Sequence, residues 1–117
     1  MINVLWLCNI VLPDFSQEFG IKRASTGGWM TGMLHALEAV DMINISLCFP
    51  IYDKSRLKSG VCGGHMYFTF LRDSVEEYSM EMINSFERIL EESQPNIVHI
   101  WGTEFPHTTA MLLACRN

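Results

Sequence analysis

The stretch Asn3–Asn9 has the sequence NVLWLCN, and it decides the class of fold. It is a continuous apolar run between two asparagines, and Pro13 follows it closely. A run of this length and composition is typical of a strand buried on both faces of a parallel sheet. Three further segments carry strand patterns of apolar, β-branched and aromatic residues: Ile43–Pro50, His65–Leu71 and Ile97–Trp101.

Helical patterns alternate with these strands. Gly27–Gly28 open the first helix, whose apolar stripe begins at Trp29 and which we expect to end near Val40–Asp41. The segment Ser74–Ser93 is the clearest helix, because the pattern Ser74-x-x-Glu77 is a capping box ahead of a long apolar stripe. Pro106 suits the first turn of a third helix, where its missing N–H is not needed.

The order of elements predicts an α/β domain over residues 1–117, with three layers and a mainly parallel sheet. Counted along the chain, the four predicted strands are expected in the spatial order 3-2-1-4. The segment between Ile43–Pro50 and His65–Leu71 has no helical pattern, which favours a hairpin connection over a helical crossover. Ligands of such sheets bind at the carboxyl ends of the strands where the chain reverses its direction of travel, here the first and the last strand.

Two segments converge on that crevice. The long predicted loop Ile10–Thr26 leads into Thr26-Gly27-Gly28, where the backbone can approach an anionic or hydroxyl-rich ligand closely. Thr103, Glu104 and His107 follow the last strand. A histidine in the first turn of a helix favours its neutral form and can accept a proton. The structural alternatives are a tight glycine loop without a ligand, a helix-stabilising Glu104 and a solvated His107.

Composition excludes several classes of protein. The chain has a net charge of −5, so general binding to nucleic acid is not expected. Its four cysteines form no C-x-x-C pair and no zinc-module spacing, which predicts reduced thiols and no metal site. The N-terminus lacks the basic region of a signal peptide, and the apolar runs are too short to cross a bilayer. These features predict a cytoplasmic protein without a cofactor.

Two stretches together resemble a known family. TGGWMTGMLHAL at residues 26–37 and PNIVHIWGTEFPHT at residues 95–108 are similar to the N-terminal domain of the family 4 retaining glycosyltransferases. The resemblance implies one Rossmann-like half of a GT-B fold, in which two such domains face a deep cleft. It implies transfer of a sugar from a nucleotide-sugar to a glycan or lipid-linked acceptor, with retention and without a metal for the chemistry.

The resemblance also implies roles for individual residues. Gly27 and Gly28 match the glycine loop beside the donor phosphates or the transferred sugar, and Thr103 and Glu104 lie in a segment on the sugar and acceptor side. Many members carry a histidine at the end of the last strand, where this chain has Trp101. His107 is therefore our candidate catalytic residue. The family's nucleotide contacts lie mostly in a C-terminal domain that is not among these 117 residues.

We therefore expect a fragment of a longer enzyme that is inactive alone, with an apolar face able to self-associate. The expected setting is polysaccharide synthesis in the cytoplasm or at the inner membrane face. The alternative is a separate Rossmann-like module that binds a nucleotide or regulates a partner without catalysis. The reading frame beyond Asn117 distinguishes the two hypotheses.

Overall fold

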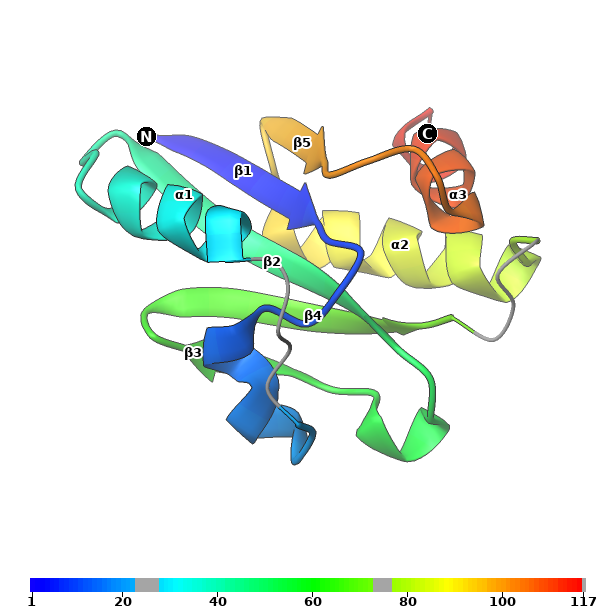
Figure 1. Ribbon diagram of the computed structural model, residues 1–117. Coiled ribbons are helices and arrows are strands. Elements are labelled where there is room, and N and C mark those ends of the chain that lie inside the picture. Colours follow the sequence, from blue (N-terminus) through cyan, green and yellow to red (C-terminus); the bar gives the residue numbers. More distant parts are fainter. Residues whose placement is uncertain (23–27, 73–76, 117) are drawn as a thin grey trace.

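The four predicted strands and one further strand form a five-stranded sheet in a computed structural model that describes residues 1–22, 28–72 and 77–116. Its order is β3-β4-β2-β1-β5 (Figure 1). The strands are β1 (Ile2–Leu7), β2 (Ile43–Ile51), β3 (Ser59–Cys62), β4 (His65–Leu71) and β5 (Ile97–Ile100). All neighbouring pairs are parallel except β3 and β4. The sheet is thus mostly parallel, as predicted.

Strand β1 lies between β2 and β5, so the predicted adjacency of the first and last strands is confirmed. Leu7 is in register with Cys48 on one side and with Ile100 on the other. Both neighbours run in the same direction as β1, and their carboxyl ends therefore meet at one edge of the sheet. This edge is where the sequence placed the candidate site.

The predicted four-stranded order 3-2-1-4 is not confirmed, because it leaves out β3. The segment before His65 forms an antiparallel hairpin with β4 around Gly63 and Gly64, whose φ angles are 60° and 83°. Two consecutive residues with positive φ are typical of a tight hairpin turn. The expected hairpin between residues 43–50 and 65–71 is also wrong, since β2 and β4 are parallel.

Helices cover both faces of the sheet, which confirms the three layers (Figure 1). On one face lie α1 (Gly28–Glu38) and the 3-10 helix η1 (Pro13–Phe19), which forms inside the segment predicted as a long loop. On the other face lie α2 (Met80–Ser93) and α3 (Pro106–Cys115). A second 3-10 turn, η2 (Lys54–Arg56), follows β2.

Alternate residues of β1 supply the two halves of the core. Trp6 packs in the cluster beneath α1 and η1, while Leu5 and Leu7 pack beneath α2 and α3. All three side chains are at most 1% exposed. Burial of one such side chain contributes roughly 2–3 kcal/mol before its conformational entropy is subtracted. Both faces of the central strand therefore hold the layers together.

Helix α2 begins later than its sequence pattern suggested. Its N-cap is Ser79, whose hydroxyl accepts a hydrogen bond from the backbone N–H of Met82 at 3.1 Å. The predicted capping box is therefore wrong as the start of this helix, although Ser74 itself lies outside the described residues. The helix ends as predicted before Pro95, with Gln94 in the left-handed conformation at φ 46°.

Pro50 lies inside β2 rather than closing it. The carbonyl of Cys48 accepts from the N–H of Cys8, so residues 48 and 50 direct their backbone polar groups toward the β1 side. Strand β1 has ended at that level, and a donor is not needed there. On the opposite side, Ile51 accepts from the N–H of Arg72 at 2.8 Å.

Strand β5 is an edge strand whose α1-side face is only partly covered. Ile97 is 52% exposed, and His99, which is in register with Trp6 and stacks on Trp101, is also exposed. A shallow hollow of about 400 Å³ lies on this face, over Val4, Trp6 and the side chains of β5. We name this region the β5 open face; Ile97, His99 and Trp6 are its central residues.

Candidate functional site

The end of β5 and the start of α1 lie against each other at the carboxyl edge of the sheet. The indole ring of Trp29, the second residue of α1, packs edge-on against that of Trp101 with 4.9 Å between centroids. Trp101 directly precedes Gly102. The backbone N–H of Trp101 donates a hydrogen bond to the carbonyl oxygen of Leu7 at 3.0 Å. The corner that bears Gly28 and the corner that bears Glu104 therefore share one rim.

Asn9 organises this rim, although the sequence did not single it out. Its Nδ2 donates to the carbonyl oxygen of Trp101 at 2.5 Å and to Oε1 of Glu104 at 2.8 Å. Its Oδ1 lies 2.9 Å from Nε2 of His107. Only one orientation of the amide satisfies all three partners, because a carbonyl and a carboxylate both accept. Nε2 of His107 consequently carries the proton and donates to Asn9.

His107 lies in the first turn of α3 as expected, but its side chain is fully buried rather than solvated. Its ring packs edge-on against Phe70 and is stacked with Phe105. Within the described part of the chain, Nδ1 has no hydrogen-bond partner. A second proton would have to sit there, among aromatic rings. Burial, reinforced by the charge of Arg72, lowers the pKa of His107 to about 4, and the ring is neutral near pH 7.

Arg72 follows β4 directly and is only 5% exposed. Its guanidinium carbon lies 3.6 Å from the centroid of the Phe105 ring, a close cation–π contact. One Nη donates to the hydroxyl of Tyr52 at 3.3 Å, while its Nε has no partner among the described residues. Arg72 therefore links the end of β4 to both the loop after β2 and the loop after β5.

Gly102 gives the rim its shape. Its φ of 98° is a conformation that residues with a side chain rarely adopt. A Cβ at this position would meet the carboxylate of Glu104 and would lie 2.8 Å from Nδ2 of Asn9. The chain therefore turns in the only way that leaves room for the contact between Asn9 and Glu104. The hydroxyl of Thr108 stabilises this turn into α3 by donating a hydrogen bond to the carbonyl oxygen of Gly102 at 3.0 Å.

The predicted site residues fall into three groups. Thr103 and Glu104 are exposed on the rim, where a carboxylate can accept hydrogen bonds from ligand hydroxyl groups. Gly28 is the exposed first residue of α1, with open space around the position of a Cβ. Gly27 lies outside the described residues, as does Thr26. His107 is joined to this rim through its hydrogen bond to Asn9 and through its stacking on Phe105.

Sequence reasoning missed Asn9 and Arg72. Arg72 directly follows β4, and Asn9 lies two residues after the end of β1; the ends of buried strands are where an α/β sheet places its functional side chains. That positional signal was available for both residues. The contacts that give these residues their role join distant parts of the chain; Asn9 and His107, for example, are 98 positions apart. No local sequence pattern encodes such a contact.

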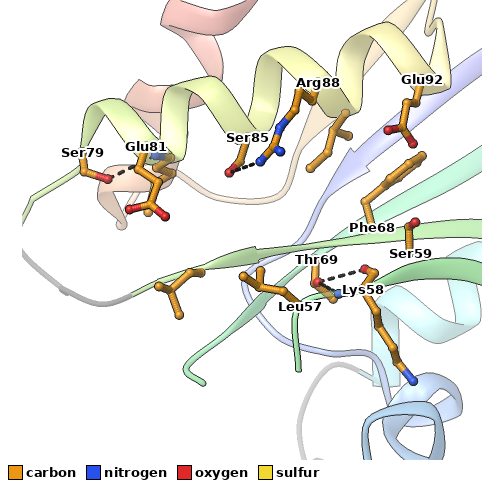
Figure 2. Close-up of a pocket in the computed structure, with 13 residues that line it drawn as sticks. Leu57, Lys58, Ser59, Phe68, Thr69, Ser79, Glu81, Ser85, Arg88 and Glu92 are labelled. Carbon is orange, nitrogen blue, oxygen red and sulfur yellow. Dashed lines mark hydrogen bonds between the residues drawn. The ribbon is translucent and has the colours of Figure 1, made fainter. Parts of the chain in front are cut away.

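Another groove lies away from this rim, between α2 and the β3–β4 edge (Figure 2). It has a volume of about 330 Å³. Figure 2 shows Ser79, Glu81, Ser85 and Arg88 along its helix wall and Phe68 and Thr69 on its sheet wall. Its lining carries charges of both signs, with the acids Glu81 and Glu92 and the bases Arg88 and Lys58. No predicted site residue is among the described residues that line it.

No family model matches the chain, and comparisons with curated proteins and with solved structures also give no match. Among the described residues, no cluster of three or more His, Cys, Asp or Glu side chains is arranged to hold a metal ion. None of the described helices combines the length and apolar character needed to span a membrane.

Proposed function

We propose that this chain is the N-terminal, acceptor-side domain of a retaining glycosyltransferase, a Rossmann-like half of a GT-B fold. The observation that carries the proposal is the contact between Trp29 and Trp101, which brings the two family-like stretches together at one rim. Parallel α/β sheets bind ligands at this edge. The alternative, a binding module without catalysis, uses the same edge and is separated from the proposal by the experiment below.

The roles follow from the chemistry of the rim. Gly28, with its neighbour Gly27, would let the N-terminus of α1 approach the diphosphate or the transferred sugar of a nucleotide-sugar. Glu104 and Thr103 would bind sugar hydroxyl groups. His107 acts in this proposal as a positioning residue, because its buried Nε2–H fixes the amide of Asn9, and that amide in turn holds Oε1 of Glu104.

A second α/β domain of the same protein would supply the nucleotide contacts and close the cleft. One wall cannot exclude water or provide preorganised stabilisation of a leaving diphosphate. The isolated 117-residue chain is therefore expected to transfer no sugar. No metal is assigned to the chemistry, and the proposed setting is cytoplasmic, peripheral at the inner membrane face.

The test is a screen of nucleotide-sugar donors with the full-length protein, followed by variants measured on the active donor. E104Q should lower kcat/KM about 10- to 100-fold, since it removes hydrogen bonds to a charged group. G28V should lower it similarly by blocking the approach of the ligand to α1. The exposed Thr109 of α3 provides the control variant T109A, which should keep full activity.

Full activity in both E104Q and G28V would remove this site assignment. Binding of a nucleotide by the 117-residue chain, together with no turnover by the full-length protein on any donor, would favour the binding module. Turnover by the 117-residue chain alone would contradict the proposed need for a second domain.

A further inference from the structure

A small cavity of about 190 Å³ lies beside the candidate site, at the carboxyl ends of β1 and β2. Its apolar walls come from the chain after β1 and from the end of β2, including Ile10, Val11, Ile21, Pro50 and Ile51. Val11, Pro50 and Ile51 are buried, so these walls are part of the folded core. Ligand pockets for drug-sized molecules measure roughly 300–1,000 Å³. This cavity therefore suits one ring or a short alkyl group.

The rim of the cavity carries more positive than negative charge. Lys22 and Arg56 line it as exposed cations, and Asp53 is the one acidic residue among the described residues of the lining. The carboxylate of Asp53 caps η2 by accepting from the backbone N–H of Ser55 at 3.0 Å. That hydrogen bond lowers the pKa of Asp53, with a smaller contribution from Arg56. A net positive rim on a chain with a net charge of −5 selects for an anionic ligand.

Tyr52 adds a hydroxyl donor to the same rim. Its side chain is 68% exposed and lines the cavity. The hydroxyl oxygen accepts a hydrogen bond from buried Arg72, and the guanidinium carbon lies 5.9 Å from the centre of the Tyr52 ring. A tyrosine hydroxyl that accepts one hydrogen bond keeps its own proton to donate. Arg72 therefore holds the ring at the cavity while the O–H remains able to bind an anion.

We propose that this cavity binds an organic phosphate, with the apolar group between Ile10, Ile21 and Ile51 and the phosphate at the rim. Arg56 offers the planar fork of donors that matches phosphate oxygens, and Lys22 offers a second positive charge. The two cations outnumber the single acidic group of the described rim, and a phosphate monoester offers three acceptor oxygens to their donors, more than a carboxylate does. The inference does not rest on the proposed glycosyl transfer, because its test uses no sugar donor.

The experiment titrates the isotope-labelled 117-residue chain with benzyl phosphate and follows the methyl resonances of Ile10, Ile21 and Ile51 by NMR. Benzyl alcohol, with the same ring and no charge, and inorganic phosphate, with the charge and no ring, are the matched probes. Benzyl phosphate should bind at least about fivefold more tightly than either, and its binding should weaken with added salt.

Two rim variants locate the phosphate. R56Q and K22Q should each weaken the binding of benzyl phosphate by about fivefold, the upper end expected for an exposed ion pair. K54Q is the matched control, since Lys54 is an exposed cation in the same 3-10 turn but does not line the cavity. All three positions are on the surface, and circular dichroism verifies that each variant is folded.

Four outcomes would overturn the proposal. Equal binding of benzyl phosphate and benzyl alcohol shows that the rim does not recognise the charge. Equal binding of benzyl phosphate and inorganic phosphate shows that the cavity walls contribute nothing. An absence of shifts at the three isoleucines, or an equal effect of K54Q and R56Q, shows that the anion binds elsewhere. Each result leaves the glycosyltransferase proposal untouched.

Discussion

Asn9 and His107 are joined by a 2.9 Å hydrogen bond between Oδ1 and Nε2, although 98 positions separate them in the chain. The bond connects the end of the central strand β1 to the first turn of α3. The same asparagine also binds the carbonyl of Trp101 and the carboxylate of Glu104. One amide thereby fixes the geometry of the proposed sugar-binding rim.

Replacement of Asn9 by leucine, which has a similar shape, should destabilise the chain by about 3 kcal/mol. The change removes three hydrogen bonds and leaves the buried Nε2–H of His107 without an acceptor. Urea unfolding measures the effect. N44L is the control, because the amide of Asn44 makes an exposed 3.3 Å hydrogen bond to Asn3, and its loss should cost less than about 0.5 kcal/mol. Equal costs for N9L and N44L would contradict the central position of Asn9.

The stability of the fold should depend on pH through His107. The unfolded histidine has a pKa near 6.5, and burial lowers the pKa in the folded state to about 4. The folded form therefore binds this proton only at a lower pH than the unfolded form. The contribution of the neutral His107 to the free energy of unfolding is fully present above pH 6.5 and is lost as the pH falls toward 4. The shift corresponds to about 3 kcal/mol.

The variant H107Q isolates this contribution, because its side-chain amide can still donate to Asn9 but does not titrate in this range. Its free energy of unfolding should fall less between pH 6.5 and pH 4 than that of the unmodified chain. H99Q removes a histidine whose pKa is also lowered by partial burial, so it should keep the part of the fall that His107 causes. Parallel curves for H107Q and the unmodified chain would show that His107 is not the titrating group.

Gly102→Ala should be more destabilising than Gly64→Ala, even though both glycines have positive φ angles, 98° and 83°. Alanine at either position carries the backbone cost of about 1–2 kcal/mol. Only at residue 102 does the new Cβ also collide with Asn9 and Glu104; at residue 64 it meets open space. Thermal unfolding of the two variants measures the difference, and equal melting temperatures would refute the crowding at the rim.

Ser79→Ala should cost about 1 kcal/mol, the usual value for the loss of an N-cap. The hydroxyl of Ser79 satisfies the N–H of Met82, which has no partner within the helix. Asn84→Ala, at an exposed position within α2, is the control and should be neutral or slightly stabilising, since alanine has the higher helix propensity. A neutral S79A would mean that α2 begins elsewhere.

The 117-residue chain is expected to self-associate through the β5 open face. Ile97 belongs to the edge strand β5 and is 52% exposed. Edge strands with exposed apolar side chains are prone to pair with other chains. Sedimentation at increasing concentration should show a rising mass. I97K should reduce that rise by placing a charge at the edge, whereas L112K, at an exposed position on helix α3 rather than at a sheet edge, should not. A chain that stays monomeric at all concentrations would oppose this expectation.

The sequence was informative wherever a local pattern coincided with burial. The apolar run of β1 predicted its central position, and the amphipathic stripe of α2 predicted the helix, because both signals depend on which residues face the core. β3 was missed because Ser59–Cys62 is short and contains Gly60, although the Gly63–Gly64 pair is a turn signal that could have indicated it.

The candidate site was predictable in position but not in its interactions. Thr103 and Glu104 lie on the rim as expected, while His107 is buried because α3 packs its first turn against Phe70 of β4. The predicted direction of its protonation preference holds, but its main cause is burial rather than the helix N-terminus. Contacts between distant residues decide such details, and they follow only from the folded arrangement.

Pro50 has a consequence for the neighbouring cavity. Because its nitrogen carries no hydrogen, β2 cannot extend its ladder with the chain that leaves β1, and Val11 and Leu12 turn inward instead of continuing as a strand. The two chains separate at this level, and the proline ring is part of the wall of the cavity between them. A single residue without a backbone N–H thus prevents two strands from pairing further and leaves space in which a small molecule can bind.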